Sequence, residues 1–420
     1  HHLPPFCRTG VQRTDNQICN NVIFKILILP IRVWLDFCNN QVKELYMEHT
    51  IKFYPVDNGD CTLIKLGNGM TVIIDCQITD AYDKDGKQVS YDVKKNLLAE
   101  LNRDGYGHPY VDLFISTHPH DDHCVGFKDN FYHGNPNEYD NNSDKGKIII
   151  GELWITPRGM GNNVATSAES IRCEAKRRRH LYDENRTYCG SYGNYLRIIG
   201  YDNQKNFDSR YAYVPGTNVK FVNGAFLSLL EIFIHAPFKE DVADCRETDD
   251  KNTTSIVTQF KFKSEDDRVV CRVLMGGDAE HDVWQHILDN NVDDANLQWN
   301  IFLAPHHCSW TFFNDSDNKQ EILKSAQDIL CKHLKNAYVI ASSKAIHSYD
   351  SNPPCEEAKK SYMKFLDDKD NFCNTATDKV INGIPQPIIF KINEHGKRKI
   401  TVTVVAGESS ISRPAPRAGM

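Results

Sequence analysis

Residues 50–76 alternate between apolar runs and short polar turns. The runs IKFYPV, CTLIKL and MTVIIDC are separated by Asp-Asn-Gly-Asp and Gly-Asn-Gly. Runs of this length, rich in β-branched residues and bounded by such turn residues, are typical of consecutive strands. We therefore predict three strands joined by tight turns at the start of a domain.

The pattern then changes to a helix and returns to strands. Leucines and a valine at helical spacing predict a helix over residues 91–104, and VDLFIST at 111–117 indicates a short buried strand. Further strands are predicted at 148–157, 226–237, 253–262, 268–278 and 299–307, and later in AYVIASS, PIIFKI and KITVTVV. Further helices are predicted at 167–185, at 321–334 and in EEAKKSYMKFL. Two runs of strands interleaved with helices predict an α/β fold with helices outside two packed sheets.

The chain is predicted to hold one domain with two flanking segments. The apolar stretch Val22–Phe37 contains a lysine, a proline and an arginine, and it is shorter than the roughly 20 apolar residues that a membrane span needs. We expect residues 1–46 to precede the true start of the protein and 47–408 to form a single domain, with an insertion at about 128–215. Residues 409–420 are predicted to be a disordered tail.

Composition narrows the class of protein. The chain has 420 residues and a formal net charge of −7, which argues against an extended surface that coats nucleic acid. Its 14 cysteines include no C-x-x-C pair. This usage indicates reduced thiols in a cytoplasmic protein rather than a disulfide framework.

The run His118-Pro119-His120-Asp121-Asp122-His123 follows the predicted strand at 111–117. Imidazole and carboxylate are the ligands that zinc and similar divalent metals prefer. Catalytic groups are common on loops at strand ends. A solvated polar loop is the alternative, but three histidines and two aspartates in six residues favour a metal site.

The same run resembles the H-x-H-x-D-H signature of the metallo-β-lactamase superfamily. Downstream, MGGDAEHD resembles the glycine–aspartate motif of that superfamily, and FLAPHHCSW resembles its L-x-x-P-H-H-G-S motif. DNGDCTLI, IHAP, NTTSIVTQF and PHHCSW make the chain most similar to the hydrolase domain of the DNA-uptake protein ComEC and its soluble relatives, over residues 50–405. The resemblance implies a four-layer αββα metallo-β-lactamase sandwich.

The resemblance also implies a set of metal ligands around two divalent ions. The implied ligands are His118 and His120 for the first ion, Asp122, His123 and His306 for the second, and Asp278 as the bridge between them. Zinc is the expected metal, with manganese or iron as alternatives. Two such ions lower the pKa of a shared water from about 15.7 to roughly 7, which makes hydroxide available for hydrolysis.

Two departures from the family pattern concern this site. Most members carry a further histidine for the first ion, whereas this chain has Asn252 near that place. His235 is the nearest histidine, and it is either a ligand or a core residue. Cys308 stands where the family usually has glycine, and packing in a tight turn or contact with the metal would each account for a thiol there.

Several residues are predicted to support the ligands or to contact substrate. Asp75 and Asp121 are expected to orient ligand histidines, with a solvated loop acid as the alternative for Asp121. His307 would orient its turn or meet the substrate. His347 would donate a proton to a leaving group or contact a phosphate, and it joins Asp122 and Asp278 as a predicted catalytic residue. A surface histidine is the alternative for both His307 and His347.

The remaining polar positions carry weaker signals. Asp57 and Asp60 are interpreted as turn residues, and residues 342–344 as part of the rim of the site. The basic run Lys176–His180 either grips a polyanion near the site or forms a solvated helix face balanced by nearby glutamates.

Three functions from different classes fit these features. The first is a two-metal hydrolase of phosphodiesters, a nuclease or nucleotide phosphodiesterase, with nucleic acid or a nucleotide as partner. The second is a hydrolase of a lactone, thioester or β-lactam, because the same activated water serves both chemistries. The third is a non-catalytic relative that keeps a metal. No membrane partner is expected, and the oligomeric state is open.

Overall fold

The computed structural model describes most of the chain from residue 48 onward. The described residues are 48–184, 186–187, 189–200, 210–242, 251–316 and 319–400. The predicted extension at 1–46 and the predicted tail at 409–420 lie outside these residues, and so does most of the predicted strand KITVTVV. Within the described residues, no helix is both long enough and apolar enough to cross a membrane.

Eleven strands form the larger sheet, whose main path runs β22–β21–β1–β2–β3–β5–β7–β8–β9, with β4 beside β5 and β6 beside β7. The strands are β1 (His49–Phe53), β2 (Thr62–Lys65), β3 (Thr71–Ile74), β4 (Asn102–Arg103), β5 (Pro109–Ile115), β6 (Phe131–Tyr132), β7 (Ile148–Ile155), β8 (Tyr195–Ile199), β9 (Ala212–Tyr213), β21 (Ile388–Asn393) and β22 (Gly396–Ile400). Strands β3, β5, β7 and β8 pair in parallel. Their carboxyl ends therefore lie at the same edge of the sheet.

Seven strands form the second sheet, in the order β10–β13–β14–β15–β16–β17–β18. They are β10 (Asn218–Val219), β13 (Leu230–Ala236), β14 (Val257–Lys263), β15 (Val269–Met275), β16 (Trp299–Leu303), β17 (His333–Ala341) and β18 (Phe372–Asn374). Strands β15 to β18 pair in parallel. This sheet therefore also has one edge at which several carboxyl ends meet.

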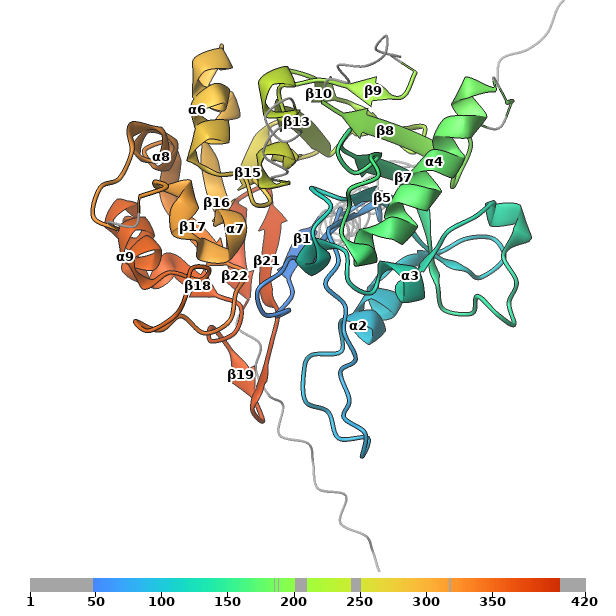
Figure 1. The fold of residues 1–420 in the computed structure, drawn as a ribbon, viewed down its shortest axis with the longest axis horizontal. Coiled ribbons are helices and arrows are strands. Elements are labelled where there is room, and N and C mark those ends of the chain that lie inside the picture. Colours follow the sequence, from blue (N-terminus) through green and yellow to red (C-terminus); the bar gives the residue numbers. More distant parts are fainter. Residues whose placement is uncertain are drawn as a thin grey trace, which may run out of the picture. The chain divides into compact units, whose positions relative to one another are not determined.

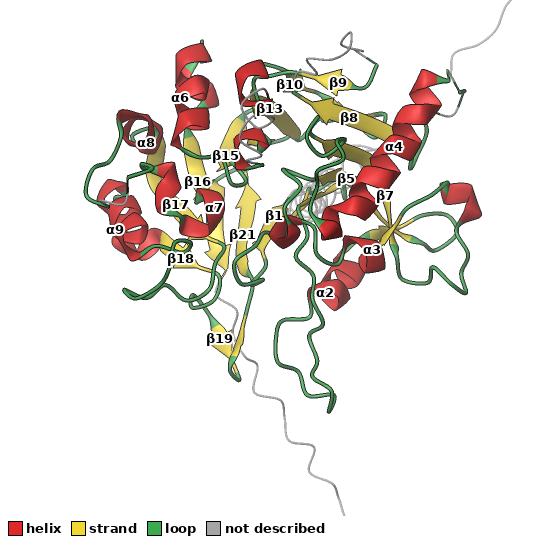
Figure 2. Cartoon of the chain, viewed as in Figure 1, coloured by secondary structure: helices red, strands yellow, loops and turns green. Residues whose placement is uncertain are grey.

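Each sheet packs against its own group of helices. The helices on the larger sheet are α2 (Val93–Glu100), α3 (Phe127–Asn130) and α4 (Glu169–Asp183), and those on the second sheet are α6 (His281–Asn290), α8 (Lys324–Leu330) and α9 (Glu356–Phe365). Figures 1 and 2 show the two helix groups on opposite outer sides, with strands between them. Burial of two separate apolar clusters under these helices stabilises both sheets.

The two sheets contact each other through the faces that the helices leave free. Tyr338 of β17 packs edge-on against Phe390 of β21, with ring centroids 5.0 Å apart. His49 of β1 lies against Phe262 of β14 at 5.6 Å. The predicted α/β fold is confirmed.

Local signals and strand pairing each set some of the element boundaries. Helix α2 begins after Asp92, whose side chain accepts a hydrogen bond from the backbone N–H of Lys95 and so caps the helix. The predicted helix at 321–334 is shorter, because His333 and the residues after it pair with β16 as strand β17. Helix α6 was not predicted from the sequence.

The stretch at 128–215, predicted as an insertion, contributes strands to the larger sheet. It supplies β6 to β9 and α4, and all eight residues of β7 are buried. Within this stretch, the guanidinium of Arg178 is buried under α4. It donates to the backbone carbonyls of Ile150, Gly151 and Tyr195 and to Glu174. This arginine therefore fixes α4 to the sheet.

The basic run Lys176–His180 does not match either predicted role as a whole. Arg178 is committed to the sheet, and Arg177 binds Glu174 and Asn194. Arg179 lies 3.7 Å from Asp183, and the exposed His180 lies 2.9 Å from Glu184. Binding of a polyanion by Arg177 and Arg178 is thus contradicted, because their donors already have protein partners.

Candidate metal centre

The candidate site lies where strands of both sheets end. Asp75 follows β3, the loop of His118 and His123 follows β5, Asp278 follows β15, and the His306–His307 turn follows β16. Because β3 and β5 are parallel, as are β15 and β16, each pair delivers its loops to one edge. The topology therefore brings together segments that are far apart in the sequence.

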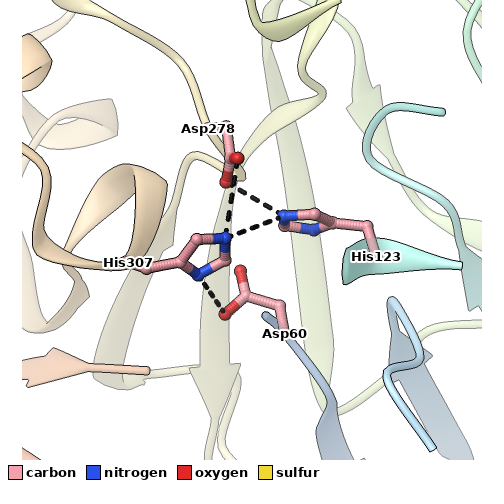
Figure 3. Close-up of side chains that lie close together, drawn as sticks. All are labelled: Asp60, His123, Asp278 and His307. Carbon is pink, nitrogen blue, oxygen red and sulfur yellow. Dashed lines mark hydrogen bonds and ion pairs between the residues drawn. The ribbon is translucent and has the colours of Figure 1, made fainter. Parts of the chain in front are cut away.

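Two groups of side chains in this region have mutually close ligand atoms, within 4.8 Å of one another. The inner group comprises Asp60, His123, Asp278 and His307, all of which are buried, and the outer group comprises His118, His120 and Asp278. Figure 3 shows the imidazoles and carboxylates of the inner group converging from four different segments. Asp278 belongs to both groups.

Asp75 holds the histidine loop, His118 to His123, in place through hydrogen bonds. Its carboxylate accepts hydrogen bonds from the backbone N–H of Thr117 at 2.8 Å and from the Thr117 hydroxyl at 2.6 Å. It also lies 2.8 Å from Nδ1 of His123. Since the carboxylate oxygen accepts in this contact, Nδ1 of His123 carries the hydrogen, and Nε2 presents a lone pair when the ring is neutral.

The ring of His307 is oriented in the same way by a backbone carbonyl. Its Nδ1 lies 3.1 Å from the carbonyl oxygen of Ser342, which can only accept, so Nδ1 is the donor. Its Nε2 then faces three further acceptors: Nε2 of His123 at 3.3 Å, Oδ2 of Asp122 at 3.1 Å and Oδ2 of Asp278 at 3.6 Å. In a neutral His307, the lone pair of Nε2 would therefore face the lone pairs of these acceptors.

The outer group repeats this arrangement with His118. The hydroxyl of Thr117 gives its hydrogen to Asp75, so its oxygen accepts from Nδ1 of His118 at 3.1 Å. Nε2 of a neutral His118 then carries a lone pair and lies 3.1 Å from Nδ1 of His120 and 3.5 Å from Oδ2 of Asp278. Nitrogen and oxygen atoms again converge on one region.

The pKa shifts separate the two groups. Burial would lower the pKa of His123, but the carboxylates of Asp278 and Asp75 raise it well above its usual value. The pKa of His307 is also raised. Burial would lower it, but the carboxylates of Asp278 and Asp122 raise it. In the outer group, burial and the neighbouring imidazoles lower the pKa of His118, and they lower that of His120 to about 4.

The donors of the site fit a divalent cation. Burial alone would raise the pKa of Asp278, yet the surrounding histidines hold it well below its usual range. Its Oδ1 lies 3.0 Å from Nε2 of His123 without forming a hydrogen bond of acceptable geometry. A buried carboxylate oxygen that faces imidazole lone pairs needs either a proton or a cation between them. The site can therefore hold a metal ion.

The turn that carries His306 and His307 has an unusual backbone. In the short helix α7 (Pro305–Cys308), His306, His307 and Cys308 have φ of 49°, 53° and 67°. Left-handed conformations cost non-glycine residues about 1–3 kcal/mol each, and such residues concentrate at functional sites. The strain at Cys308 explains why a glycine would suit that position.

Neighbouring contacts hold this turn in place. The N–H of His306 donates to the carbonyl of Gly277 at 3.1 Å. A side chain at Gly277 would meet Thr117 at 3.0 Å, so the close approach of the β15 end to the histidine loop requires glycine. Cys308 is buried, the N–H of Cys355 donates to its carbonyl, and burial raises the pKa of its thiol. These contacts favour the packing interpretation of Cys308.

His306, a predicted ligand, lies beside Asp278 but in neither group of close ligand atoms among the described residues. Its Nε2 is 3.8 Å from Oδ2 of Asp278, and its Nδ1 is 3.4 Å from Glu280. Asn252 donates to the same glutamate at 3.2 Å, so it reaches the site through Glu280. His307, which the sequence analysis gave a supporting role, stands in the inner group instead.

The structure places Asp60 in the inner group and Asp122 beside it. Asp60, interpreted as a turn residue, is buried and belongs to the inner group. Asp122, a predicted ligand, has a side chain that is 37% exposed and lies against Nε2 of His307. Burial opposes ionisation of Asp122, but the contact with His307 lowers its pKa below the usual range.

Three predicted residues have partners away from these groups. The carboxylate of Asp121 accepts from the N–H and hydroxyl of Ser167, which ties the turn before α4 to the histidine loop. Nε2 of His235 lies 2.9 Å from the carbonyl of Asn296, and burial lowers its pKa to about 4, as in a core histidine. His347 is exposed on the loop after β17 and stacks on Tyr349.

The comparisons with known proteins add no relative. No protein-family model matches the chain, and no curated protein matches it. Its assignment therefore depends on the residues and their geometry.

Proposed function

We propose that this chain is a metal-dependent hydrolase with two divalent cations, which the inner group and the outer group would hold, with Asp278 common to both. Zinc is the first choice of metal because imidazole nitrogen and carboxylate oxygen supply all the donors. The observation that carries the proposal is the environment of Nε2 of His307. In a neutral ring, whose hydrogen lies on Nδ1, this atom faces Nε2 of His123 and the carboxylates of Asp122 and Asp278 with no hydrogen between them.

The architecture supports the same proposal. Helices lie outside two sheets that contact each other, and the site occupies the ends of strands from both sheets. This arrangement supports our assignment of the chain to the four-layer αββα sandwich of the metallo-β-lactamase superfamily. The motifs HPHDDH, MGGDAE and PHHCSW supply the residues of the site in the order expected for that superfamily.

The residues of the chain would perform distinct tasks in hydrolysis. Bound divalent cations supply Lewis acidity and lower the pKa of water toward neutrality. Asp75 and the Ser342 carbonyl hold the rings of His123 and His307 with their Nε2 atoms toward the site. Fixed orientation of this kind avoids reorganisation during the reaction, which is a major part of electrostatic catalysis.

The substrate class we propose is a phosphodiester, as in a nuclease or nucleotide phosphodiesterase. The support for this class is the loop after β17, which lies beside the site. The N–H of Lys344 on this loop donates to the side chain of Asn58, in the turn that also carries Asp60. The side chains of Lys344 and His347 on this loop are exposed and could contact a phosphate. The basic run on α4 does not support this substrate, since its central arginines are already bound.

The test combines metal analysis with a substrate panel on the full chain. The panel contains bis-p-nitrophenyl phosphate, a lactone, a thioester and a β-lactam. We expect about two equivalents of zinc and cleavage of the phosphodiester. Turnover of a carbonyl substrate without phosphodiesterase activity would replace the substrate class. Less than one equivalent of metal and no turnover would overturn the hydrolase proposal.

A further inference from the structure

We infer that Asp60 is a ligand of the inner cation and that it closes that position, while the outer position stays open to exchange. This inference rests on the proposed two-metal function. It assigns a binding role to a residue that its sequence context identifies only as part of a turn. Asp60 lies in the turn between β1 and β2, far in sequence from the three motifs that supply the other site residues.

The side chain of Asp60 is buried and faces the inner group. The residue is only 5% exposed, and its carboxylate lies among the close ligand atoms of that group. Its nearest charged neighbour is Nδ1 of His307 at 3.9 Å, and that nitrogen is directed to the carbonyl of Ser342. Figure 3 shows the carboxylate turned toward the His307 ring and the inner group. A second buried carboxylate beside Asp278 is costly unless a cation compensates its charge.

The backbone around Asp60 is fixed, so the direction of its side chain is built into the fold. Its N–H donates to the carbonyl of Asp122 at 3.3 Å, and its own carbonyl accepts from the N–H of Gln77. A Cβ on Gly59 would lie 2.6 Å from the Asp122 carbonyl oxygen. Only glycine therefore allows the turn to approach the histidine loop this closely, and that approach delivers Asp60 to the site.

The donor counts of the two groups then differ. With Asp60, the inner group offers two imidazoles and two carboxylates, whose charge of −2 balances a divalent ion. Four protein donors are typical of closed zinc positions, whereas three leave a coordination place open. The outer group has three donors, shares one of them, and includes the incompletely buried His120. We therefore expect the inner position to fill first and the outer position to exchange.

The variant Asp60→Asn tests this role against a matched control, Asp57→Asn. Both residues lie in the same turn, and Asp57 is exposed with φ of 60°, a conformation that asparagine tolerates. Zinc affinity is measured by competition with a chromophoric chelator. We expect a tight and a weak class of site in the wild type and in Asp57→Asn. In Asp60→Asn the tight class should weaken at least about 100-fold, since loss of mere supporting groups already costs 10–100-fold.

Thermal unfolding separates ligation from a structural role. Without metal, Asp60→Asn should unfold at the wild-type temperature or higher, because the substitution removes a buried charge. With saturating zinc, its stabilisation should be smaller than that of the wild type, since stabilisation by a ligand grows with its affinity. A lower unfolding temperature without metal, together with an unchanged zinc response, would show that Asp60 is structural and would overturn the inference.

The outcomes distinguish this inference from the proposed function. If the wild type and Asp60→Asn both bind two zinc ions with equal affinity, the role of Asp60 falls and the two-metal hydrolase stands. If the wild type binds no zinc, both fall together.

Discussion

The inner and outer groups of the site differ in burial, charge and proton balance, although Asp278 belongs to both. The inner group is fully buried, and its carboxylates raise the pKa of His123 and His307. In the outer group, burial and the neighbouring imidazoles lower the pKa of His118 and His120. The inner group thus holds excess negative charge that a cation or a proton must compensate. The outer group lacks this excess, so we expect it to bind metal more weakly.

The largest effect should come from Asp278→Asn, which removes the carboxylate common to both groups. We expect loss of metal from both positions and a fall in hydrolysis of about 10³-fold or more, since charge stabilisation by the metals is worth several kcal/mol. Metal content and steady-state rates measure these effects. The metal-free variant should still fold, because an amide can donate to the imidazole lone pairs around it. Full activity in this variant would remove Asp278 from the bridge.

The pair His307→Ala and His120→Ala separates the two groups. His307→Ala should abolish tight zinc binding, whereas His120→Ala should keep one tightly bound equivalent and lose the second. Both should reduce hydrolysis by at least about 10²-fold, because both cations act in the proposed reaction. Metal content after dialysis against a weak chelator distinguishes them. Equal retention in the two variants would contradict the difference between the groups.

A smaller effect is expected from Asp75→Asn, which acts on the inner group through His123. The amide keeps the shape of the side chain, but it no longer accepts from Thr117 and His123 as a carboxylate does. Zinc affinity at the tight position should fall by about 10–100-fold. The free energy of unfolding should fall by about 1–3 kcal/mol, because buried donors lose their acceptor. Unchanged affinity in chelator competition would show that Asp75 serves the fold alone.

The sequence predicted the α/β class and pointed to three motif segments, because their signals are local. Alternating apolar runs reveal strands, and the density of ligands in HPHDDH reveals a metal loop without any knowledge of the fold. The structure brings His118, His120, His123 and Asp278 together, as the resemblance implied.

The choices within each motif depended on information that the sequence does not hold. Two adjacent histidines in PHHC are equivalent by spacing, and only the left-handed backbone of His306 and His307 decides which ring faces the inner group. Asp60 stands in an ordinary turn sequence, and its burial follows from the contact of Gly59 with the histidine loop. Arg178 belongs to a run that suggests a solvated face, yet the carbonyls it binds lie on β7 and β8. Each of these outcomes was set by long-range packing.

The smallest expected effect is a difference in pH dependence between the two positions. Metal binding requires neutral imidazoles. Because the pKa of His123 and His307 is raised above 6.5, protons compete with the inner cation already near neutral pH, and its affinity should fall as the pH is lowered. One displaced proton corresponds to about tenfold in affinity per pH unit. The pKa of His120 is lowered to about 4, so its ring stays neutral between pH 8 and 6, roughly the range in which a histidine usually titrates. The affinity of the outer group for metal should therefore hardly change over that range. Zinc titrations by calorimetry in two buffers of different ionisation enthalpy measure the protons released at each step. Equal release at both steps would show that the two groups do not differ in the way their carboxylates imply.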